Sequence, residues 1–550
     1  MSDRPNILVL MTDQQRYDAM SCSGNDKIRT PHMDALASSG VRFSQAVTPT
    51  PVCVAARMSF ITGHRVARHH WVANGALPGP VPELPTMMNL LLQNGYWTQG
   101  IGKMHFHGRH HGLRDLMTME EGVKNWVDDD YIQYLMENGV RTRYPKGFRD
   151  LLYMQPQTCG IPAEHHMNTW VADRSVDFLR EHTRHRNDQP FFLWSSWISP
   201  HPPFAPCEPY DDMYDPEEMD MAPFSDRPID TLPPGFYGSR ARLDGAHHDP
   251  DRIRRLRALY YGLVSHVDDG VGRILSELET LGLAENTVVL FVSDHGEMMG
   301  EHGMSQKNCP YESSARIPFL LRWPGKTQAG KVCDDLVSLL DVFPTLIDEL
   351  GLEYPEEHRP LTGASLLGAE GGGLAQPRSS MIIDYGSDKS RWIAARNQKH
   401  MYAFFAYGGV EELYDLESDP HEEHNLIGEQ PKLAEEFRSQ ILDWEKEHGL
   451  SAEGDHLRTY PGSEQIPAEE DCRGVNLNDG PWPKRLPDDE QDRIETFAEG
   501  FTRAISKETS LSPDKLSIGD YKKKVLKLGP YDSGGESLEG TPWEDAWNDA

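Results

Sequence analysis

The sequence predicts an α/β fold, a doubly wound sheet with helices packed on both of its faces. Three short apolar runs lack the alternation of a half-exposed strand and therefore favour buried parallel strands: Ile7–Met11, Phe191–Ile198 and Thr287–Val292. Helix-like segments lie between these runs, and strands that alternate with helices are typical of such sheets.

The remaining elements of this core follow in order along the chain. A weaker apolar run, Tyr96–Ile101, comes after a helix-like segment from Met87 to Gln93. The longest predicted helix has apolar residues three or four positions apart, which form one stripe: Leu256, Leu259, Leu263, Val267, Val271, Ile274 and Leu278. Gly282 follows the stripe, and we expect the helix to stop there.

The C-terminal part is expected to form smaller units. A row of glycines ending at Gly373 predicts a boundary between a main domain, 1–373, and a subdomain, 374–450. A short antiparallel sheet and a helix from about Lys432 are expected in this α+β subdomain, with strands at Met381–Asp384, Arg391–Ala395 and His400–Phe405. Residues 451–550 are rich in Pro, Gly and acids. Three roles stay open for this extension: wrapping the body, pairing subunits in a homo-oligomer, or bordering the active site.

The composition argues against several classes of partner. The 86 acidic and 54 basic residues give a formal net charge of −32, which repels phosphate backbones, so no nucleic acid partner is expected. No stretch approaches the ~20 apolar residues of a membrane span. The first apolar run is too short for a signal peptide, and the dispersed cysteines contain no Cys-x-x-Cys pair. A cytoplasmic enzyme is predicted, or a periplasmic or secreted one if a signal was removed.

Reactive side chains directly follow four of the predicted strands: Asp13 with Gln14, Lys103 with His105, His201, and Asp294 with His295. In open α/β sheets ligands bind at the carboxyl ends of the strands, so these side chains are expected to converge on one site. A single aspartate in such a place is more often a helix cap. The joint pattern is what favours a site.

Asp13, Asp294 and His295 form a mixed oxygen and nitrogen ligand set, with the amide of Gln14 beside it. Such ligands suit a hard divalent ion: calcium, magnesium or manganese. The imidazole favours manganese without excluding calcium. Zinc is disfavoured because neither a thiolate nor a pair of histidines accompanies the set.

The segment Thr48–Gly63 is the most specific part of the chain. A short helix is expected over Ala55–Ile61, which puts Cys53 at a helix N-terminus, where free N–H groups favour negative charge. Arg57 lies one turn further along. These residues alone indicate either a reactive thiolate beside a cation or an ordinary buried cysteine.

The run Cys53-Val54-Ala55-Ala56-Arg57, with Thr62-Gly63 behind it, resembles the signature of formylglycine-dependent (type I) sulfatases of the alkaline phosphatase superfamily. Further motifs resemble that family in the same order: Pro5–Asp13, Thr30–Ala37, Gly102–His105, Ser293–Glu297, Gly300–Gly303, Lys307, Glu412–Leu416 and Asp419–Leu426. The resemblance implies an alkaline-phosphatase-like sheet sandwiched by helices. It also implies that a formylglycine-generating or maturase enzyme oxidises Cys53.

The same resemblance implies a set of roles around one divalent ion, calcium by family habit and manganese as the alternative. The ion would be held by Asp13, Gln14, residue 53, Asp294 and His295. A hydroxyl of hydrated formylglycine 53 would attack sulfur, and His105 would take the proton that lets sulfate leave. Arg57 and Lys103 would hold the formylglycine oxygens, and Lys103 and Lys307 would offset the charge of the sulfate. His201, with Lys307, would protonate the leaving oxygen. Asn74 would contact the substrate.

Two positions depart from the common sulfatase pattern. Gln14 and His295 stand where many sulfatases carry Asp and Asn, and these combinations also resemble the phosphonate monoester hydrolase branch. The expected function is hydrolysis of a sulfate monoester, of a sugar or of a small alkyl or aryl alcohol, which releases inorganic sulfate. The alternatives are a phosphonate monoester or phosphodiester hydrolase on the same scaffold, and a non-catalytic binding protein with unmodified Cys53.

Overall fold

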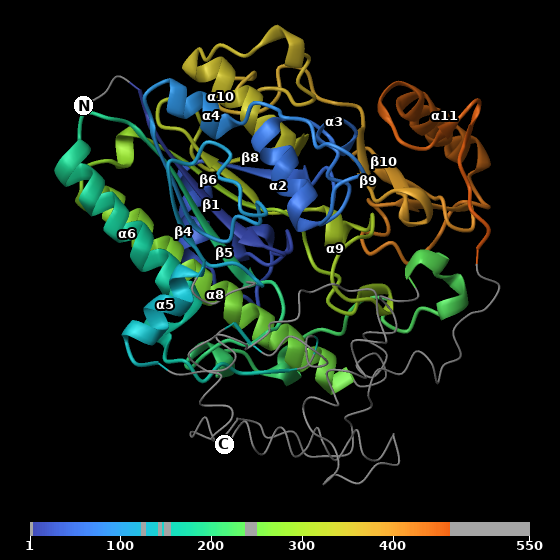
Figure 1. Ribbon diagram of the computed structural model, residues 1–550. Coiled ribbons are helices and arrows are strands. Elements are labelled where there is room, and N and C mark those ends of the chain that lie inside the picture. The colour runs from blue at the N-terminus through green and yellow to red at the C-terminus, as the bar shows by residue number, and fades with distance from the viewer. Residues whose placement is uncertain are drawn as a thin grey trace.

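An eight-stranded sheet forms the centre of the computed structural model, which describes residues 4–122, 128–140, 146–147, 154, 156–236 and 250–462. The strand order is β4-β3-β5-β1-β6-β7-β2-β8, with helices on both faces (Figure 1). The strands are β1 Asn6–Asp13, β2 Val41–Val47, β3 Trp97–Gly102, β4 Asp115–Thr118, β5 Phe191–Pro200, β6 Thr287–Ser293, β7 Phe319–Arg322 and β8 Lys331–Ser338.

The three strongest predicted strands are neighbours at the middle of this sheet. β1 pairs in parallel with β5 on one side and with β6 on the other, so that Leu8 lies opposite both Leu193 and Val289. The predicted α/β class is confirmed. β7 was not predicted, and it runs antiparallel to β6 and β2, which makes the sheet mixed. The segment between β6 and β7 stays at the carboxyl end of β6, so the chain has to return in the opposite direction.

The helices of the main body are α1 Pro31–Ser39, α2 Cys53–Thr62, α3 Val66–His69, α4 Met87–Gln93, α5 Asp130–Glu137, α6 Met167–Arg186, α8 Pro250–Thr280, α9 Glu312–Ala315 and α10 Val342–Leu350. Successive side chains of β1 point into two different core layers. Leu8 and Leu10 pack with residues of α6 and α8, whereas Ile7, Val9 and Met11 pack with residues of α2, α4 and α10. β1 is therefore buried on both faces, as its unbroken apolar run predicted.

A smaller antiparallel sheet, in the order β12-β11-β10-β9, lies beside the body (Figure 1). Its strands are β9 Met381–Tyr385, β10 Trp392–Arg396, β11 His400–Phe405 and β12 Val410–Asp415, and α11 Pro431–His448 packs on one face through Phe437 and Ile441. The other face packs against Val47, Met298 and Tyr311 of the body. The antiparallel sheet with one helix is confirmed, and the exact domain boundaries stay a prediction.

Beyond this sheet, β13 Ala452–Glu453 and β14 His456–Leu457 form a short hairpin. The predicted extension 451–550 lies outside the described residues from 463 onward. Among the described helices, none combines the length and the apolar character needed to cross a bilayer.

Candidate active site

Four neighbouring strands deliver the predicted side chains to one edge of the sheet. Asp13 ends β1, Lys103 follows β3, His201 follows β5, and Asp294 follows β6. These strands lie side by side in the order β3-β5-β1-β6, and all run in parallel. The convergence expected from the strand ends is therefore present in the structure.

Asp13, Cys53, Asp294 and His295 form a buried cluster at this edge. One oxygen, sulfur or nitrogen atom from each lies within 4.8 Å of the others. The sulfur of Cys53 is 3.2 Å from Nε2 of His295 and 3.8 Å from Oδ1 of Asp13. Nδ1 of His295 faces the carbonyl oxygen of Gly296 at 3.0 Å and donates to it, so Nε2 is the nitrogen that faces the cluster.

Cys53 is the first residue of α2, as predicted. The preceding residue, Val52, is extended and supplies no side-chain cap. Oδ1 of Asn74 instead accepts a hydrogen bond from the N–H of Val54 at 3.2 Å. Asn74 thus caps the helix that carries Cys53, and its predicted contact with substrate stays a prediction.

Arg57 contacts both carboxylates of the cluster, those of Asp13 and Asp294. Its Nε donates to Oδ2 of Asp294 at 2.8 Å, and Nη2 lies 3.5 Å from Oδ2 of Asp13. Nη1 donates to the carbonyl of Lys103 at 2.6 Å and to Oγ of Ser196 at 3.0 Å. All of these groups are buried, so the guanidinium holds the side chains of Asp13 and Asp294 in fixed positions.

Lys103, His201 and Lys307 line the side of the cluster nearest to Glu121. Lys103 Nζ contacts carboxylate oxygens of both Asp13 and Glu121. His201 Nε2 lies 2.8 Å from Lys307 Nζ and 3.5 Å from Oε2 of Glu121. His201 Nδ1 lies 2.8 Å from the Pro202 carbonyl, which can only accept, so Nδ1 holds a proton and Nε2 is the nitrogen that exchanges one.

Lys307 reaches the site from the return segment between β6 and β7. Its Nζ donates to Oε1 of Gln14 at 2.5 Å, and Nε2 of Gln14 donates to the buried Glu297. The next residue, Asn308, is held from two sides: its N–H donates to Pro51 at 3.1 Å, and its carbonyl accepts from Trp392 Nε1 at 2.8 Å. The smaller sheet thus helps to position Lys307.

His105 lies next to this group with a left-handed φ of 59°. Its N–H donates to Oε1 of Glu120 at 2.8 Å, while its buried Nδ1 has no hydrogen-bond partner among the described residues. Burial, and then the charge of Lys103, lower the pKa of His105 to about 3. The ring is therefore neutral at neutral pH and has a lone pair available.

The charges of the site also change the pKa of Asp13 and of Cys53. Burial alone would raise the pKa of Asp13, but nearby positive groups, Lys103 first, hold it well below its usual value. Burial and the Asp13 carboxylate raise the pKa of the Cys53 thiol. Lys103 and Lys307 outweigh both, so this pKa falls below 9.0. The site therefore favours negative charge at both positions.

Three residues of the site were not predicted: Glu121, Ser196 and Glu297. Glu121 follows β4, a half-exposed edge strand of four residues without an apolar run. Ser196 lies inside β5, where a polar side chain within a buried apolar strand was a usable signal. Glu297 lies in the predicted motif Ser293–Glu297, but nothing in the sequence indicated that it holds Gln14.

Two family models match the chain: one described as Sulfatase, over residues 5–352, and one described as N-sulphoglucosamine sulphohydrolase, C-terminal, over residues 300–447. The chain is 32% identical over 502 residues to a protein named arylsulfatase from Clostridium perfringens, which covers 84% of this chain and 98% of that protein. It is 28% identical over 507 residues to a multifunctional alkaline phosphatase superfamily protein from Trinickia caryophylli, which covers 81% and 96%.

The fold is also similar to that of a solved structure, the phosphonate monoester hydrolase of Agrobacterium radiobacter. The TM-score is 0.67 at 24% sequence identity, over 81% of this chain and 96% of that one. At this identity the likeness concerns the fold alone.

Proposed function

The chain belongs to the sulfatase family and is a sulfuric ester hydrolase, and from this premise we propose that it cleaves the sulfate monoester of a sugar or of a small alkyl or aryl alcohol. One observation carries the proposal: Cys53 begins a helix within a buried cluster of Asp13, Asp294 and His295, with Arg57, Lys103 and Lys307 around it. A negative side chain at position 53 and an incoming sulfate are both favoured there.

The cluster fits one divalent ion. Two buried carboxylates and an imidazole whose Nε2 faces the cluster are suited to calcium or manganese. Asp13, Asp294 and His295 would hold the ion together with residue 53. Gln14 would hold it only by sharing its oxygen with Lys307. When bound, such an ion neutralises sulfate oxygens and lowers the pKa of a hydroxyl attached to it.

Position 53 also fits the proposed oxidation of Cys53 to formylglycine. Hydrated formylglycine supplies two hydroxyls in place of one thiol. Lys103 and Arg57 supply positive charge close to residue 53, and the unpartnered Nδ1 of His105 can accept a proton in the same region. These residues would hold the nucleophile and take up its proton, so that no water needs to attack sulfur. Water enters the reaction when it re-forms the hydrate from the aldehyde after sulfate has left.

His201 and Lys307 are the groups suited to protonate the leaving oxygen. The contact of 2.8 Å between His201 Nε2 and Lys307 Nζ allows one proton to be shared by the pair. Nδ1 is occupied by the Pro202 carbonyl, so Nε2 is the atom of His201 that faces the substrate side. General acid help of this kind is worth roughly 10²–10⁴-fold.

A second candidate function is hydrolysis of phosphonate monoesters or phosphodiesters. The supporting observation is the pair Gln14 and His295 at the two departing positions, a combination that also resembles the phosphonate monoester hydrolase branch. Nitrophenyl esters of sulfate, phenylphosphonate and a phosphodiester, assayed side by side, separate the two. A higher kcat/KM for either phosphorus ester than for the sulfate would replace the main proposal with the second.

The direct test of the proposal is the mass of the intact protein and the activity of Cys53 variants. Formylglycine lowers the mass of the cysteine residue by about 18 Da. Cys53→Ala should abolish turnover while the fold persists, and Cys53→Ser should be almost as poor; Cys309→Ala serves as a matched control at another buried thiol. An unmodified Cys53 in a protein that still hydrolyses the esters would contradict the mechanism. Unmodified Cys53 without activity would instead indicate a binding protein.

A further inference from the structure

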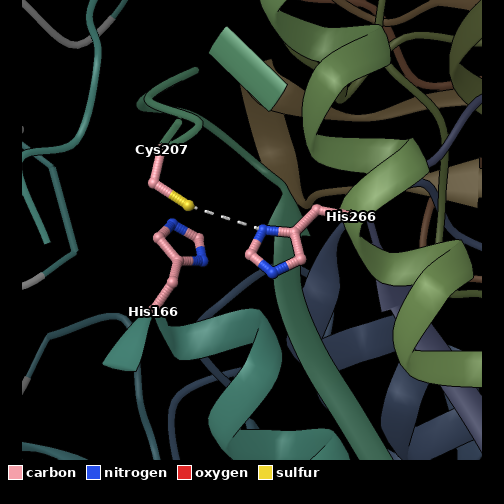
Figure 2. Close-up of side chains that lie close together, drawn as sticks. All are labelled: His166, Cys207 and His266. Carbon is pink, nitrogen blue, oxygen red and sulfur yellow. Dashed lines mark hydrogen bonds between the residues drawn. The ribbon is translucent and has the colours of Figure 1, made fainter. Parts of the chain in front are cut away.

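A second cluster of metal-binding side chains lies away from the candidate active site. His166 precedes the first residue of α6, Cys207 lies in the loop after β5, and His266 lies in the middle of α8 (Figure 2). All three are buried, at 1%, 0% and 3% exposure respectively. One ligand atom from each lies within 4.8 Å of the other two.

We propose that His166, Cys207 and His266 bind a structural zinc ion. Thiolate sulfur and imidazole nitrogen are the ligands that zinc takes in structural sites, and the hard-ion cluster at Asp13 has a different donor set. The two sites would therefore select different metals in the same chain.

The distances in the cluster are close to those that zinc requires. Sγ of Cys207 lies 3.9 Å from Nδ1 of His266. Tetrahedral zinc, with bonds of about 2.3 Å to sulfur and about 2.0–2.1 Å to nitrogen, separates such a pair of atoms by about 3.6 Å. Figure 2 shows both imidazole rings beside the sulfur. A shift of a few tenths of an ångström therefore suffices for this pair.

His266 is oriented as a metal ligand is. Its Nε2 lies 2.9 Å from Oγ1 of Thr169, which leaves Nδ1 as the nitrogen that faces Cys207. Its ring stacks on Tyr210 with a centroid distance of 4.0 Å and an angle of 6°. Metal-bound histidines usually have their second nitrogen fixed by such an outer contact, which sets the tautomer and the ring plane.

His166 has a competing role, because its Nδ1 accepts a hydrogen bond from the N–H of Asn168 at 3.2 Å. Binding a metal through either nitrogen ends this cap, since the neutral ring then needs Nδ1 for the metal or for its proton. Binding through Nδ1 removes this one long helix-cap bond, and binding through Nε2 also removes the backbone hydrogen bond of the ring with Ala205. Either loss is small against a full set of metal bonds.

The fourth position has a neighbour of suitable chemistry. Cys159 forms a one-residue parallel bridge with Cys207, and its N–H donates to the Pro206 carbonyl at 2.9 Å. Its side chain is partly buried against the main core. The Cys159 sulfur does not belong to the group of atoms within 4.8 Å of one another, so a rotation of its side chain or a water molecule would supply the fourth ligand.

The proposed ion would tie together three elements that position the leaving-group side of the active site. Cys207 lies in the same loop as His201, while α6 and α8 both pack against β5. Zinc at this point would hold the loop to the two helices. Its removal should lower the melting temperature, with no ligand of the Asp13 cluster disturbed.

The test measures metal content in protein produced with zinc and then desalted. Wild-type protein should carry about one zinc per chain, and Cys207→Ser and His266→Gln should each lose it. Two controls should keep it: Cys22→Ser, the same exchange outside the cluster, and Asp294→Ala, which removes a ligand of the hard-ion site. Equal zinc in wild-type and Cys207→Ser protein, or a wild-type content below about a tenth per chain, would overturn the proposal.

A second measurement uses only the wild-type chain, in case the variants fail to fold. Protein whose mass confirms formylglycine at position 53, stripped of metal by a chelator and refilled with cobalt(II), should show a thiolate-to-cobalt charge-transfer band. The Asp13 cluster then offers only oxygen and nitrogen ligands and cannot give this band. Absence of this band contradicts the proposal. So does a disulfide between Cys159 and Cys207, found by non-reducing peptide mapping, because it would remove the thiolate ligand.

Discussion

The carboxylate of Glu121 occupies the place where an incoming sulfate would find its positive partners. It contacts Lys103 Nζ, lies 3.5 Å from His201 Nε2, and belongs with Cys53 to a group whose ligand atoms are all within 4.8 Å of one another. Under the proposed function, a substrate has to displace this resident anion before it can bind. We therefore expect Glu121→Gln to bind sulfate esters and inorganic sulfate more tightly than the wild-type enzyme.

The size of the effect follows from the bond that the substrate must replace. A hydrogen bond to a charged group contributes about 1.5–3 kcal/mol. Gln keeps such a bond to the Lys103 ammonium but loses the carboxylate charge, which accounts for roughly half of the bond between two ions, so the exchange weakens the hold of residue 121 by about 1–1.5 kcal/mol. Glu121 is 15% exposed and Lys103 is fully buried, so solvent screens this pair only in part. The inhibition constant of inorganic sulfate should fall by about 5- to 13-fold.

The assay is inhibition of nitrophenyl sulfate turnover by inorganic sulfate at fixed ionic strength, with KM from the same data. Glu137→Gln, an equal exchange at an exposed position of α5, is the control for net charge. An inhibition constant that is unchanged or higher in Glu121→Gln would refute the reasoning. Glu121 would then be a residue that orients Lys103 rather than a competitor of the substrate.

Three further predictions concern the proton donor, the metal and the buried histidines. His201→Ala should reduce turnover of alkyl or sugar sulfates by roughly 10²–10⁴-fold and that of nitrophenyl sulfate far less, because nitrophenolate leaves without a proton. Plots of log kcat/KM against leaving-group pKa for the wild-type and variant enzymes test this, and parallel lines would assign His201 to binding. Asp294→Ala should lose its calcium or manganese in elemental analysis, and full activity after exhaustive chelation would contradict a metal role. Burial lowers the pKa of His69 from 6.5 to about 3, so its neutral form stabilises the fold above pH 6.5, and that contribution is lost as the pH falls towards 3. His69→Gln should therefore flatten the pH dependence of the unfolding free energy by up to about 1.4 kcal/mol per pH unit below 6.5, whereas exposed His185→Gln should leave the slope unchanged.

Much of the candidate site could be predicted from the sequence, because each residue follows a strand that the local pattern identifies and these strands are neighbours in the sheet. Asp13, His201 and Asp294 each follow a mainly apolar run without regular polar alternation, and such runs identify strands that are buried on both faces. Once those strands are parallel neighbours, their carboxyl ends meet. Cys53 and Arg57 were indicated by the spacing of one turn along a helix.

The rest depends on contacts between segments that carry no local signal. Glu121 follows a short, half-exposed edge strand. Lys307 was predicted from the family resemblance alone, because it lies on an irregular return segment whose antiparallel exit strand, β7, has only four residues. His166, Cys207 and His266, the proposed zinc ligands, come from a helix cap, a loop and a helix interior, with no regular spacing between them. Only the packing of α6 and α8 beside β5 brings these three together.

The complete burial of Cys53 sets a time limit on any enzyme that modifies it. In the folded chain its exposure is 0%, and the strand that closes the cluster over it, β6, ends about 240 residues later. At a synthesis rate of about 5–20 residues per second, Cys53 is synthesised roughly 12–48 s before Asp294. During that interval the cluster around residue 53 cannot form, because Asp294 and His295 have not been synthesised. A modifying enzyme can then reach the segment around Cys53 before the sheet is complete. Once β6 pairs with β1, an unmodified thiol is enclosed for the lifetime of the fold.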